Sequence, residues 1–329
     1  MMGGRGFERL FPTGPLCIIA QARISPVGDS HHYRMNPKPS SPRVLLIGAG
    51  YVGAYLAQRL RQDGVALQIC DRQDLPGVDL ALDYDHLSAA QLAPFSHVLW
   101  FAGHASVAQS VADPLAAARN NCTHLFELAQ RLAAHTHFIY ASTASLYSSD
   151  AMAPRPALAS DLIHPGSNAY DTSKFAFDYL AKGFLSGFTG LRMGTLCGFS
   201  PRLRPELIFN QMNITALRDK VVRVANPERH RSILFLSDLY QVVRACLALP
   251  HAVNGFINLA SLNLTIGEIA QRIAHHHRVP VQTMPDSPTY SFTMDTQRAQ
   301  QVLPMSFDTD LPAQCTAFTQ AWQSPAPAP

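Results

Sequence analysis

The chain has 329 residues, of which 47% are apolar and 15% are charged, and its formal net charge at pH 7 is +3. This balance is ordinary for a globular protein and excludes a mainly disordered chain. The first 42 residues carry five basic and two acidic side chains, so the rest of the chain has no net charge. We therefore expect no nucleic-acid partner. We also expect no membrane partner, because no apolar run approaches the roughly 20 residues of a membrane-spanning helix.

Residues 1–42 are rich in proline, glycine, serine and arginine and show no sustained hydrophobic period. We expect a disordered leader in this segment. An organelle transit segment is the alternative, because basic residues outnumber acidic ones. The proline- and alanine-rich end of the chain, residues 324–329, is expected to be a disordered tail.

From Arg43 onward, short apolar runs alternate with amphipathic stretches. The runs predict strands at 44–47, 65–70, 97–101, 137–141, 190–195, 233–235 and 256–259. The amphipathic stretches predict helices that end near Leu60 or span 115–134, 170–184 and 266–274. This alternation predicts an α/β fold with a doubly wound parallel sheet and a smaller C-terminal lobe. In such a sheet, ligands bind at the carboxyl ends of the strands.

A glycine-rich motif, Gly48-Ala-Gly50-Tyr51-Val52-Gly53, directly follows the first predicted strand and opens a helix. In this context Gly48 permits a tight turn, Gly50 lets the backbone approach a pyrophosphate, and Gly53 allows close packing of helix and strand. The pyrophosphate would lie at the helix N-terminus, where free N–H groups favour anions. The motif predicts a Rossmann dinucleotide site.

Asp71 stands at the end of the second predicted strand, eighteen residues after Gly53. A carboxylate at this position binds the hydroxyls of the adenine ribose and repels a 2′-phosphate. The sequence therefore favours NAD over NADP. The neighbouring Arg72 keeps NADP open, because an arginine there could hold the phosphate.

Tyr170 and Lys174 are four positions apart at the start of a predicted helix. This spacing places both side chains on one face, about one turn apart. An ammonium there favours the phenolate, and we expect it to pull the pKa of Tyr170 down from about 10. Such a tyrosine can exchange a proton with a reacting hydroxyl.

The strand predicted at 137–141 leads into three hydroxyl residues, Ser142, Thr143 and Ser145. A hydroxyl at a strand end can bind the reacting oxygen and direct it toward Tyr170. For Ser145 alone, a local turn in which the side chain binds its own backbone is the competing interpretation.

With these motifs, residues from about 43 to 303 resemble the extended short-chain dehydrogenases/reductases, the NAD-dependent epimerase/dehydratase family. The segment that begins Phe101-Ala102-Gly103 and is followed by Asn121 is similar to the matching stretch of UDP-galactose 4-epimerases. The resemblance implies that these four residues bind the cofactor. It also implies that Thr143 is catalytic, that Lys174 holds the nicotinamide ribose, and that the chain forms a homodimer through the predicted helices 115–134 and 170–184.

Further along, Arg231 and Asp238 match the family's Arg-x-x-x-x-x-x-Asp segment. The resemblance implies that Arg231 binds a substrate phosphate; a surface ion pair with Glu228 is the alternative. It also places Arg204 and Asn210 at the substrate cleft, where an arginine suits an anionic or hydroxyl-rich ligand. A solvated loop is the alternative for this segment.

Departures from the family pattern limit the choice of substrate. The first family glycine is replaced by Ile47, and the asparagine usual in nucleotide-sugar enzymes is replaced by Thr195. Residues 284–293 lack the arginine expected to help hold a diphosphate. Ala144-Ser145 stands where 4,6-dehydratases have an Asp-Glu pair, so dehydration is disfavoured.

The cysteines and histidines do not suggest a metal site. The six cysteines are scattered without a Cys-x-x-Cys pair, which favours reduced thiols and a cytoplasmic location over a disulfide framework. His275, His276 and His277 are adjacent on a predicted helix and point in different directions, whereas ligands need i, i+3 or i+4 spacing.

The sequence therefore predicts an NAD-dependent oxidoreductase or epimerase that transfers a hydride at a secondary alcohol or ketone of a sugar or sugar-nucleotide-like small molecule. One alternative is a reductase or dehydrogenase of a small or apolar ketone. The other is a dinucleotide-binding sensor or complex subunit without turnover. Residues 43–195, with returning segments near 233–260, are expected to form the NAD-binding domain, and 196–323 the substrate-binding lobe.

Overall fold

The computed structural model describes residues 42–149, 155–164, 166 and 168–324. The predicted leader, apart from Pro42, and the predicted tail after Ser324 lie outside the described residues, so both remain predictions. None of the helices in the described part of the chain is both long and apolar enough to cross a membrane.

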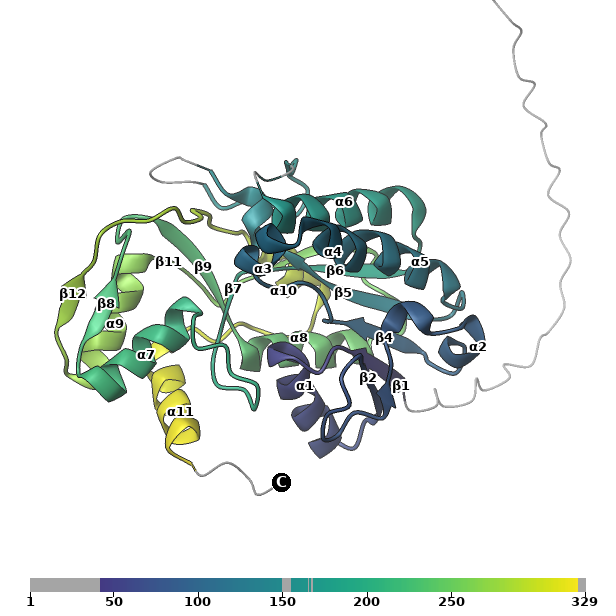
Figure 1. The fold of residues 1–329 in the computed structure, drawn as a ribbon, viewed down its shortest axis with the longest axis horizontal. Coiled ribbons are helices and arrows are strands. Elements are labelled where there is room, and N and C mark those ends of the chain that lie inside the picture. The colour runs from purple at the N-terminus through teal and green to yellow at the C-terminus, as the bar shows by residue number, and fades with distance from the viewer. Residues whose placement is uncertain (1–41, 150–154, 165, 167, 325–329) are drawn as a thin grey trace, which may run out of the picture. The chain divides into compact units, whose positions relative to one another are not determined.

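A parallel sheet of seven strands forms the centre of the fold (Figure 1). The order β10-β6-β5-β4-β1-β2-β3 confirms the predicted doubly wound α/β topology. The strands are β1 (Arg43–Ile47), β2 (Ala66–Asp71), β3 (Leu80–Ala81), β4 (His97–Trp100), β5 (His137–Thr143), β6 (Phe188–Met193) and β10 (Gly255–Leu259).

Helices cover both faces of this sheet, because its central strands are apolar on both sides. In β1, Val44 and Leu46 point into one core and Leu45 and Ile47 into the other. The first core is closed by α1 (Tyr51–Gln62), α8 (Leu236–Ala248) and α10 (Gln297–Val302). The second is closed by α5 (His124–Arg131) and α6 (Ala169–Phe184). Short connecting elements are α2 (Ala89–Leu92), α3 (Val107–Ala112) and the 3-10 turns Tyr84–His86 and Ala144–Tyr147.

The single helix predicted at 115–134 is wrong. The structure has α4 (Pro114–Ala118), a π-helical turn (Arg119–Thr123) and then α5, which ends at Arg131. The wide turn directs Asn121 inward, where its Nδ2 donates hydrogen bonds to the His104 carbonyl at 3.2 Å and to Ser173 Oγ at 3.0 Å. This buried polar anchor accounts for the break, since π-turns interrupt helices where a side chain must be redirected.

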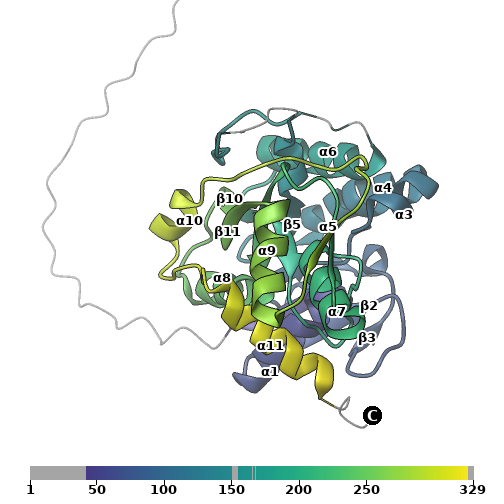
Figure 2. The ribbon, with the colours of Figure 1, turned by 90° about the vertical axis from the view of Figure 1, so that its left-hand side faces the viewer.

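Two smaller sheets (Figure 1) and three helices (Figure 2) make up most of the C-terminal part. Their shared core includes Phe209, Phe235, Ile269 and Phe318. One sheet has the order β11-β9-β7 and the other pairs β12 with β8. The elements are β7 (Thr195–Cys197), α7 (Ile208–Asp219), β8 (Val222–Val224), β9 (His230–Phe235), β11 (Leu262–Thr265), α9 (Ile266–His277), β12 (Val281–Thr283) and α11 (Leu311–Gln323).

Candidate active site

A crevice opens at the carboxyl ends of β1 and β4. These two strands are neighbours at the point where the strand order switches, with β2 and β3 on one side and β5, β6 and β10 on the other. It consists of a smaller cavity of about 220 Å³ and a larger one of about 590 Å³. Gly50, Phe101, Gly103 and Gln109 line both cavities, so the two are continuous. Most of the predicted site residues lie along this crevice.

The three motif glycines meet different surroundings. Gly48 has φ of +99°, and a side chain there would place its Cβ 2.7 Å from the Ala102 Cα. A Cβ on Gly53 would lie 1.7 Å from the Gly48 carbonyl oxygen, so this glycine packs α1 onto β1 and stays outside the crevice. By contrast, no atom lies within 4 Å of a Cβ built on Gly50.

Gly50 is the N-cap of α1, and no side chain caps this helix end. Open space in front of an uncapped helix N-terminus suits an anionic pyrophosphate. The glycine loop therefore fits a bound dinucleotide. Tyr51 and Val52 from the first turn line the larger cavity, and Tyr51 anchors the helix by donating a 2.7 Å hydrogen bond to the Gly198 carbonyl.

Asp71 and Arg72 both line the smaller cavity, together with Ala102. Asp71 is held in place because its Oδ2 accepts a hydrogen bond from the Ala49 N–H at 2.7 Å and its Oδ1 accepts one from the Gln73 N–H at 2.9 Å. A fixed carboxylate beside the glycine loop fits the hydroxyls of an adenine ribose.

Asn121, predicted to bind the cofactor, is fully buried behind Gly103. A Cβ on Gly103 would lie 2.6 Å from the Asn121 Oδ1, so Asn121 supports the crevice wall rather than lining it. Its neighbour Asn120 lines the smaller cavity instead, as does His104. Sequence analysis missed both residues. It missed Asn120 because the register within the π-turn decides which asparagine faces the cavity.

The larger cavity brings together the three residues predicted to be catalytic, Tyr170, Lys174 and Thr143. Lys174 is buried, and its Nζ donates a 2.9 Å hydrogen bond to the Ala141 carbonyl. The same ammonium lies 4.6 Å from the centroid of the Trp100 ring. Burial lowers the pKa of Lys174 to about 7.

Tyr170 is partly exposed in the larger cavity, which it lines together with Thr143. Burial raises the pKa of Tyr170, and the charge of Asp171 adds to the rise. The expectation that the Lys174 ammonium lowers this pKa is therefore wrong for the protein alone. That ammonium interacts with the Ala141 carbonyl and the indole of Trp100 instead.

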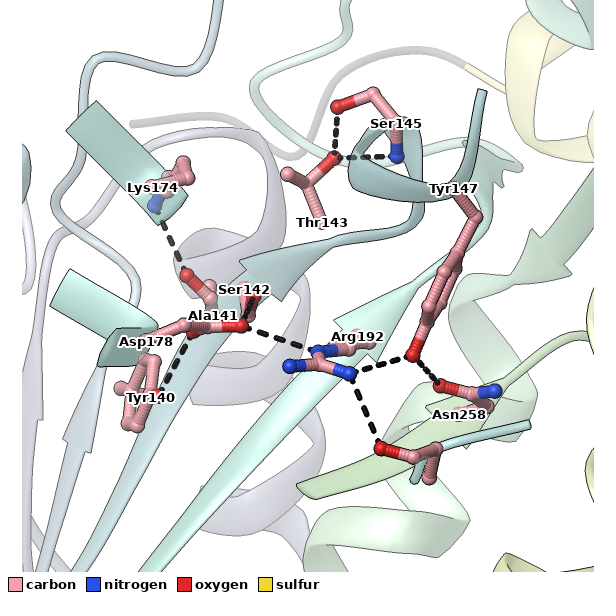
Figure 3. A network of polar contacts seen from close by, with 11 residues as sticks. Tyr140, Ala141, Ser142, Thr143, Ser145, Tyr147, Lys174, Asp178, Arg192 and Asn258 are labelled. Carbon is pink, nitrogen blue, oxygen red and sulfur yellow. Dashed lines mark hydrogen bonds and ion pairs between the residues drawn. The ribbon is translucent and has the colours of Figure 1, made fainter. Parts of the chain in front are cut away.

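Ser142 lines the larger cavity, but its hydroxyl donates a 3.0 Å hydrogen bond to Asp178 Oδ2 (Figure 3). The prediction that this hydroxyl binds substrate is not supported by its geometry. The same carboxylate accepts hydrogen bonds from Tyr140 and from Arg192 Nε at 3.0 Å. Arg192 then donates to the Tyr147 hydroxyl, which donates to Asn258 Oδ1 at 3.0 Å.

Ser145 belongs to a second network, centred on Asp171. The Ser145 hydroxyl donates to Asp171 Oδ1 at 2.5 Å and lies 2.8 Å from Thr143 Oγ1. Tyr290 donates to Asp171 Oδ2 at 2.8 Å. The predicted turn contact also exists, because the Ser145 N–H donates to Thr143 Oγ1 at 3.2 Å. Sequence analysis missed both Asp171 and Tyr290; their meeting joins α6 to a segment 119 residues later.

Arg231 lines the larger cavity and is only 7% exposed. Its Nη2 donates hydrogen bonds to Thr289 Oγ1 at 2.8 Å and to the Tyr290 carbonyl at 2.7 Å. Its Nε has no hydrogen-bond partner among the described residues. Burial lowers the pKa of this guanidinium to about 10. The alternative of a surface ion pair with Glu228 is wrong, because Arg231 is buried and its Nη2 is bonded to Thr289 and Tyr290.

Arg204 also lines the larger cavity, where its Nε donates to Glu206 Oε1 at 2.7 Å. Asn210 does not reach the cavity. It is fully buried; its Oδ1 accepts from the Gly198 N–H at 2.9 Å and its Nδ2 donates to the Arg204 carbonyl at 3.0 Å. The prediction for Asn210 is corrected accordingly: it supports the loop that carries Arg204.

The described residues contain no group of three or more histidine, cysteine or acidic side chains that could hold a metal ion. His277 ends α9 and interacts through Nε2 with Asn213 Oδ1 at 2.8 Å. Within the triplet, His277 thus joins α9 to α7, whereas His275 is exposed.

Comparison with known proteins decides the family. The profile of the NAD dependent epimerase/dehydratase family matches residues 44–260. The chain belongs to this family. A comparison with curated protein sequences gives no match. As a member of the NAD-dependent epimerase/dehydratase family, the protein is an enzyme with NAD as its cofactor.

Solved structures with the same fold include complexes that contain NAD. MoeE5 in complex with UDP-glucuronic acid and NAD has a TM-score of 0.73 and 22% identity, covering 85% of this chain and 98% of its own. UDP-N-acetylglucosamine 4-epimerase from Methanobrevibacter ruminantium M1 has a TM-score of 0.73 and 17% identity, with 86% and 98% covered. The double mutant of the dTDP-glucose 4,6-dehydratase DesIV from Streptomyces venezuelae has a TM-score of 0.71 and 16% identity, and the match covers 85% of this chain and 97% of that chain. At these identities the likeness shows the fold of the epimerase/dehydratase family.

Proposed function

We propose that this enzyme transfers a hydride at a secondary alcohol or ketone of a sugar or sugar-nucleotide-like substrate. The observation that carries the proposal is the meeting of Tyr170, Thr143 and Lys174 in a cavity continuous with the glycine loop. Residues 43–195, with segments near 233–260, would bind NAD, and 196–323 would bind the substrate.

Each residue has a distinct part in this reaction. The Gly48–Gly53 loop and Asp71 would hold NAD, which accepts and returns hydride when bound. Tyr170 exchanges the proton of the substrate oxygen, and Thr143 aligns that oxygen. Lys174 binds the nicotinamide ribose. Epimerisation uses these groups twice, in oxidation and in the return of hydride to the other face, whereas a simple reduction uses them once.

The larger cavity favours an anionic, hydroxyl-bearing substrate. Arg231 offers a buried guanidinium with an unused Nε, and Arg204 lies in the same cavity. Bidentate guanidinium contacts are well suited to phosphate and carboxylate groups. Complexes of MoeE5 with UDP-glucuronic acid and with UDP-glucose suggest where the search for ligands should begin.

A second candidate is a reductase of a small or apolar ketone. Thr195 lines the larger cavity where nucleotide-sugar enzymes usually have an asparagine, and 284–293 contain no arginine. Fewer polar contacts would hold a diphosphate less firmly. Net consumption of NADH separates this reaction from an epimerisation, which consumes none.

We also propose that two copies form a homodimer. Leu115 of α4 is 69% exposed, and Tyr179 and Phe184 of α6 are 70% and 69% exposed. Because α4 packs beside α6, these apolar side chains mark one face that a second copy can cover. Light scattering should give twice the chain mass, and Phe184→Glu should reduce it to that of a monomer.

A cytoplasmic location completes the proposal. The five cysteines in the described part of the chain are free and buried, as expected for thiols in a reducing compartment.

The decisive experiment compares the wild-type enzyme with Tyr170→Phe. Native mass spectrometry against UDP-glucose, UDP-galactose, UDP-glucuronic acid, dTDP-glucose and a set of small ketones identifies what binds. For the ligand that turns over, we expect Tyr170→Phe to lower kcat by at least about 100-fold, because the proton can no longer be exchanged. The Kd for NAD should stay within about twofold, since the glycine loop is unchanged. Unimpaired turnover in Tyr170→Phe would contradict the proposed mechanism and favour the sensor hypothesis.

A further inference from the structure

His104 is a partly buried histidine on the wall of the cofactor crevice, in the loop between β4 and α3. It lines the smaller cavity together with Gly48, Gly50 and Gly103. The loop touches the glycine turn, since a Cβ on Gly48 would lie 2.7 Å from the Ala102 Cα. His104 therefore lies beside the helix N-terminus that fits the pyrophosphate of NAD.

A hydrogen bond to the backbone positions His104 and leaves its ring nitrogens available. The His104 carbonyl accepts from Asn121 Nδ2 at 3.2 Å, and Asn121 is anchored in turn to Ser173 of α6. The imidazole forms no hydrogen bond or ion pair with another residue in the described ranges of the chain. A ring in this position can donate a hydrogen bond to an oxygen of a ligand.

The charges around His104 favour its neutral form in the protein without cofactor. The charged side chains that face His104 or line its cavity are Asp71, Arg72, Asp83, Asp113 and Lys174. Burial lowers the pKa of His104, and the charge of Arg72 lowers it further; Asp113 opposes this shift, whereas Lys174 adds to it. The imidazole is therefore mainly uncharged at pH 7.

A bound pyrophosphate would reverse this preference, because its negative charges stabilise the protonated ring. We propose that His104 is a cofactor-binding residue whose imidazolium donates a hydrogen bond to a pyrophosphate oxygen of NAD, so that NAD binding is coupled to uptake of a proton from solvent. The affinity for NAD then rises as the pH falls from the pKa of His104 in the complex toward its lower pKa in the free protein. The inference uses the cofactor of the family and does not depend on the proposed substrate.

The protonation of His104 is measured directly in protein labelled with 13C at the histidine ε1 carbon. The His104 signal is the one missing in His104→Gln, and spectra are recorded from pH 5 to 8.5 with saturating NAD and after removal of the cofactor. We expect NAD to raise the ratio of imidazolium to imidazole at pH 7 by about tenfold. In the holoenzyme, the 31P signals of bound NAD should follow the same titration, and they should lose it in His104→Gln.

Calorimetric titration with NAD at pH 6 and pH 8.5 measures the effect on affinity. We expect the ratio of the Kd at pH 8.5 to the Kd at pH 6 to be about ten times larger in the wild type than in His104→Gln. The two proteins must be compared because Lys174, with a pKa of about 7, titrates in the same range. His275→Gln is the matched control. His275 is exposed on α9 and lines neither cavity of the crevice, so this variant should behave as the wild type.

The proposal is overturned if NAD leaves the protonation of His104 unchanged or lowers it, or if His104→Gln keeps the wild-type ratio of Kd values. Coupling that appears with NADP and not with NAD would also overturn it, because His104 would then act on the 2′-phosphate, with Arg72, and not on the pyrophosphate. None of these measurements needs a substrate. They therefore still decide the inference if no compound turns over and the proposed function fails.

Discussion

Helix α6 carries two buried carboxylates, Asp171 and Asp178, about two turns apart, and their surroundings differ in charge. Each accepts a hydrogen bond from a serine hydroxyl. Asp171 accepts from Ser145, in the turn after β5, and Asp178 accepts from Ser142, near the end of β5. Asp178 is paired with the guanidinium of Arg192, 3.0 Å away and equally buried. Asp171 is held by neutral donors and lies next to Tyr170.

The comparison teaches that burial alone does not distinguish a structural carboxylate from a functional one. The Asp178 network pairs opposite charges and leads to Tyr147 and Asn258 (Figure 3). Neither Tyr147 nor Asn258 is among the residues that line the larger cavity. The Asp171 carboxylate accepts hydrogen bonds from neutral donors, and its network leads through Ser145 to Thr143, the residue that we propose to align the substrate oxygen. We expect the first network to govern stability and the second to govern proton chemistry.

The largest effect on stability is expected from Asp178→Asn. This change leaves the Arg192 guanidinium buried without its counter-charge, which should cost about 3–5 kcal/mol of the free energy of unfolding. Asp171→Asn strands no cation and should cost clearly less. Urea denaturation followed by circular dichroism measures both. Equal losses would erase the proposed difference between the two networks.

Lys174 lies between Asp171 and Asp178 in the sequence of α6, and its replacement is expected to have a smaller effect on stability that depends on pH. Because its pKa falls on folding to about 7, the unfolded chain binds more protons than the folded one from there up to about 10.5. The contribution of Lys174 to the free energy of unfolding of the wild type therefore becomes more favourable as the pH rises across this window. Lys174→Met removes the buried ammonium and should stabilise the protein by about 2–4 kcal/mol at pH 6, with the gain shrinking toward pH 10.

Melting temperatures of Lys174→Met and the wild type, recorded from pH 6 to 10, test this expectation. Lys182→Met, an exposed substitution on the same helix, serves as the control and should show no such trend. A difference in stability that does not vary with pH would mean that Lys174 keeps its ordinary pKa.

The smallest effect is expected from Tyr147→Phe. The hydroxyl of Tyr147 connects Arg192 to Asn258, and its loss should cost about 1–2 kcal/mol of unfolding free energy. The ionisation of Tyr170 should not change, because Tyr147 belongs to the network of Asp178. A change in the pKa of Tyr170 in this variant, measured by 13C NMR of labelled tyrosine, would show that the two networks are coupled.

Much of the fold could be predicted from the sequence because its signals are local. The apolar runs of β1 and β4, and the glycines that open α1, are set by periodicity and turn chemistry. The break of the helix at Arg119–Thr123 could not be predicted in this way. It depends on a hydrogen bond from Asn121 to Ser173, 52 residues later in the chain.

The same difference between local signals and tertiary contacts applies to the candidate site. Tyr170, Lys174 and Thr143 were predicted from spacing and resemblance, and the structure brings them into one cavity. Asn210 and the hydroxyl of Ser142 were assigned to the substrate, but tertiary hydrogen bonds direct both elsewhere. A sequence motif specifies which residue types are present, whereas the partner that claims a polar atom is specified by the packed fold.

The position of the Lys174 side chain depends on Gly103, a residue that has no side chain of its own. A methyl group there would collide with the Asn121 Oδ1, the Trp100 ring and the Lys174 Nζ at once. A larger residue at this position would therefore displace the Lys174 ammonium from its place over the Trp100 ring without itself contacting the substrate.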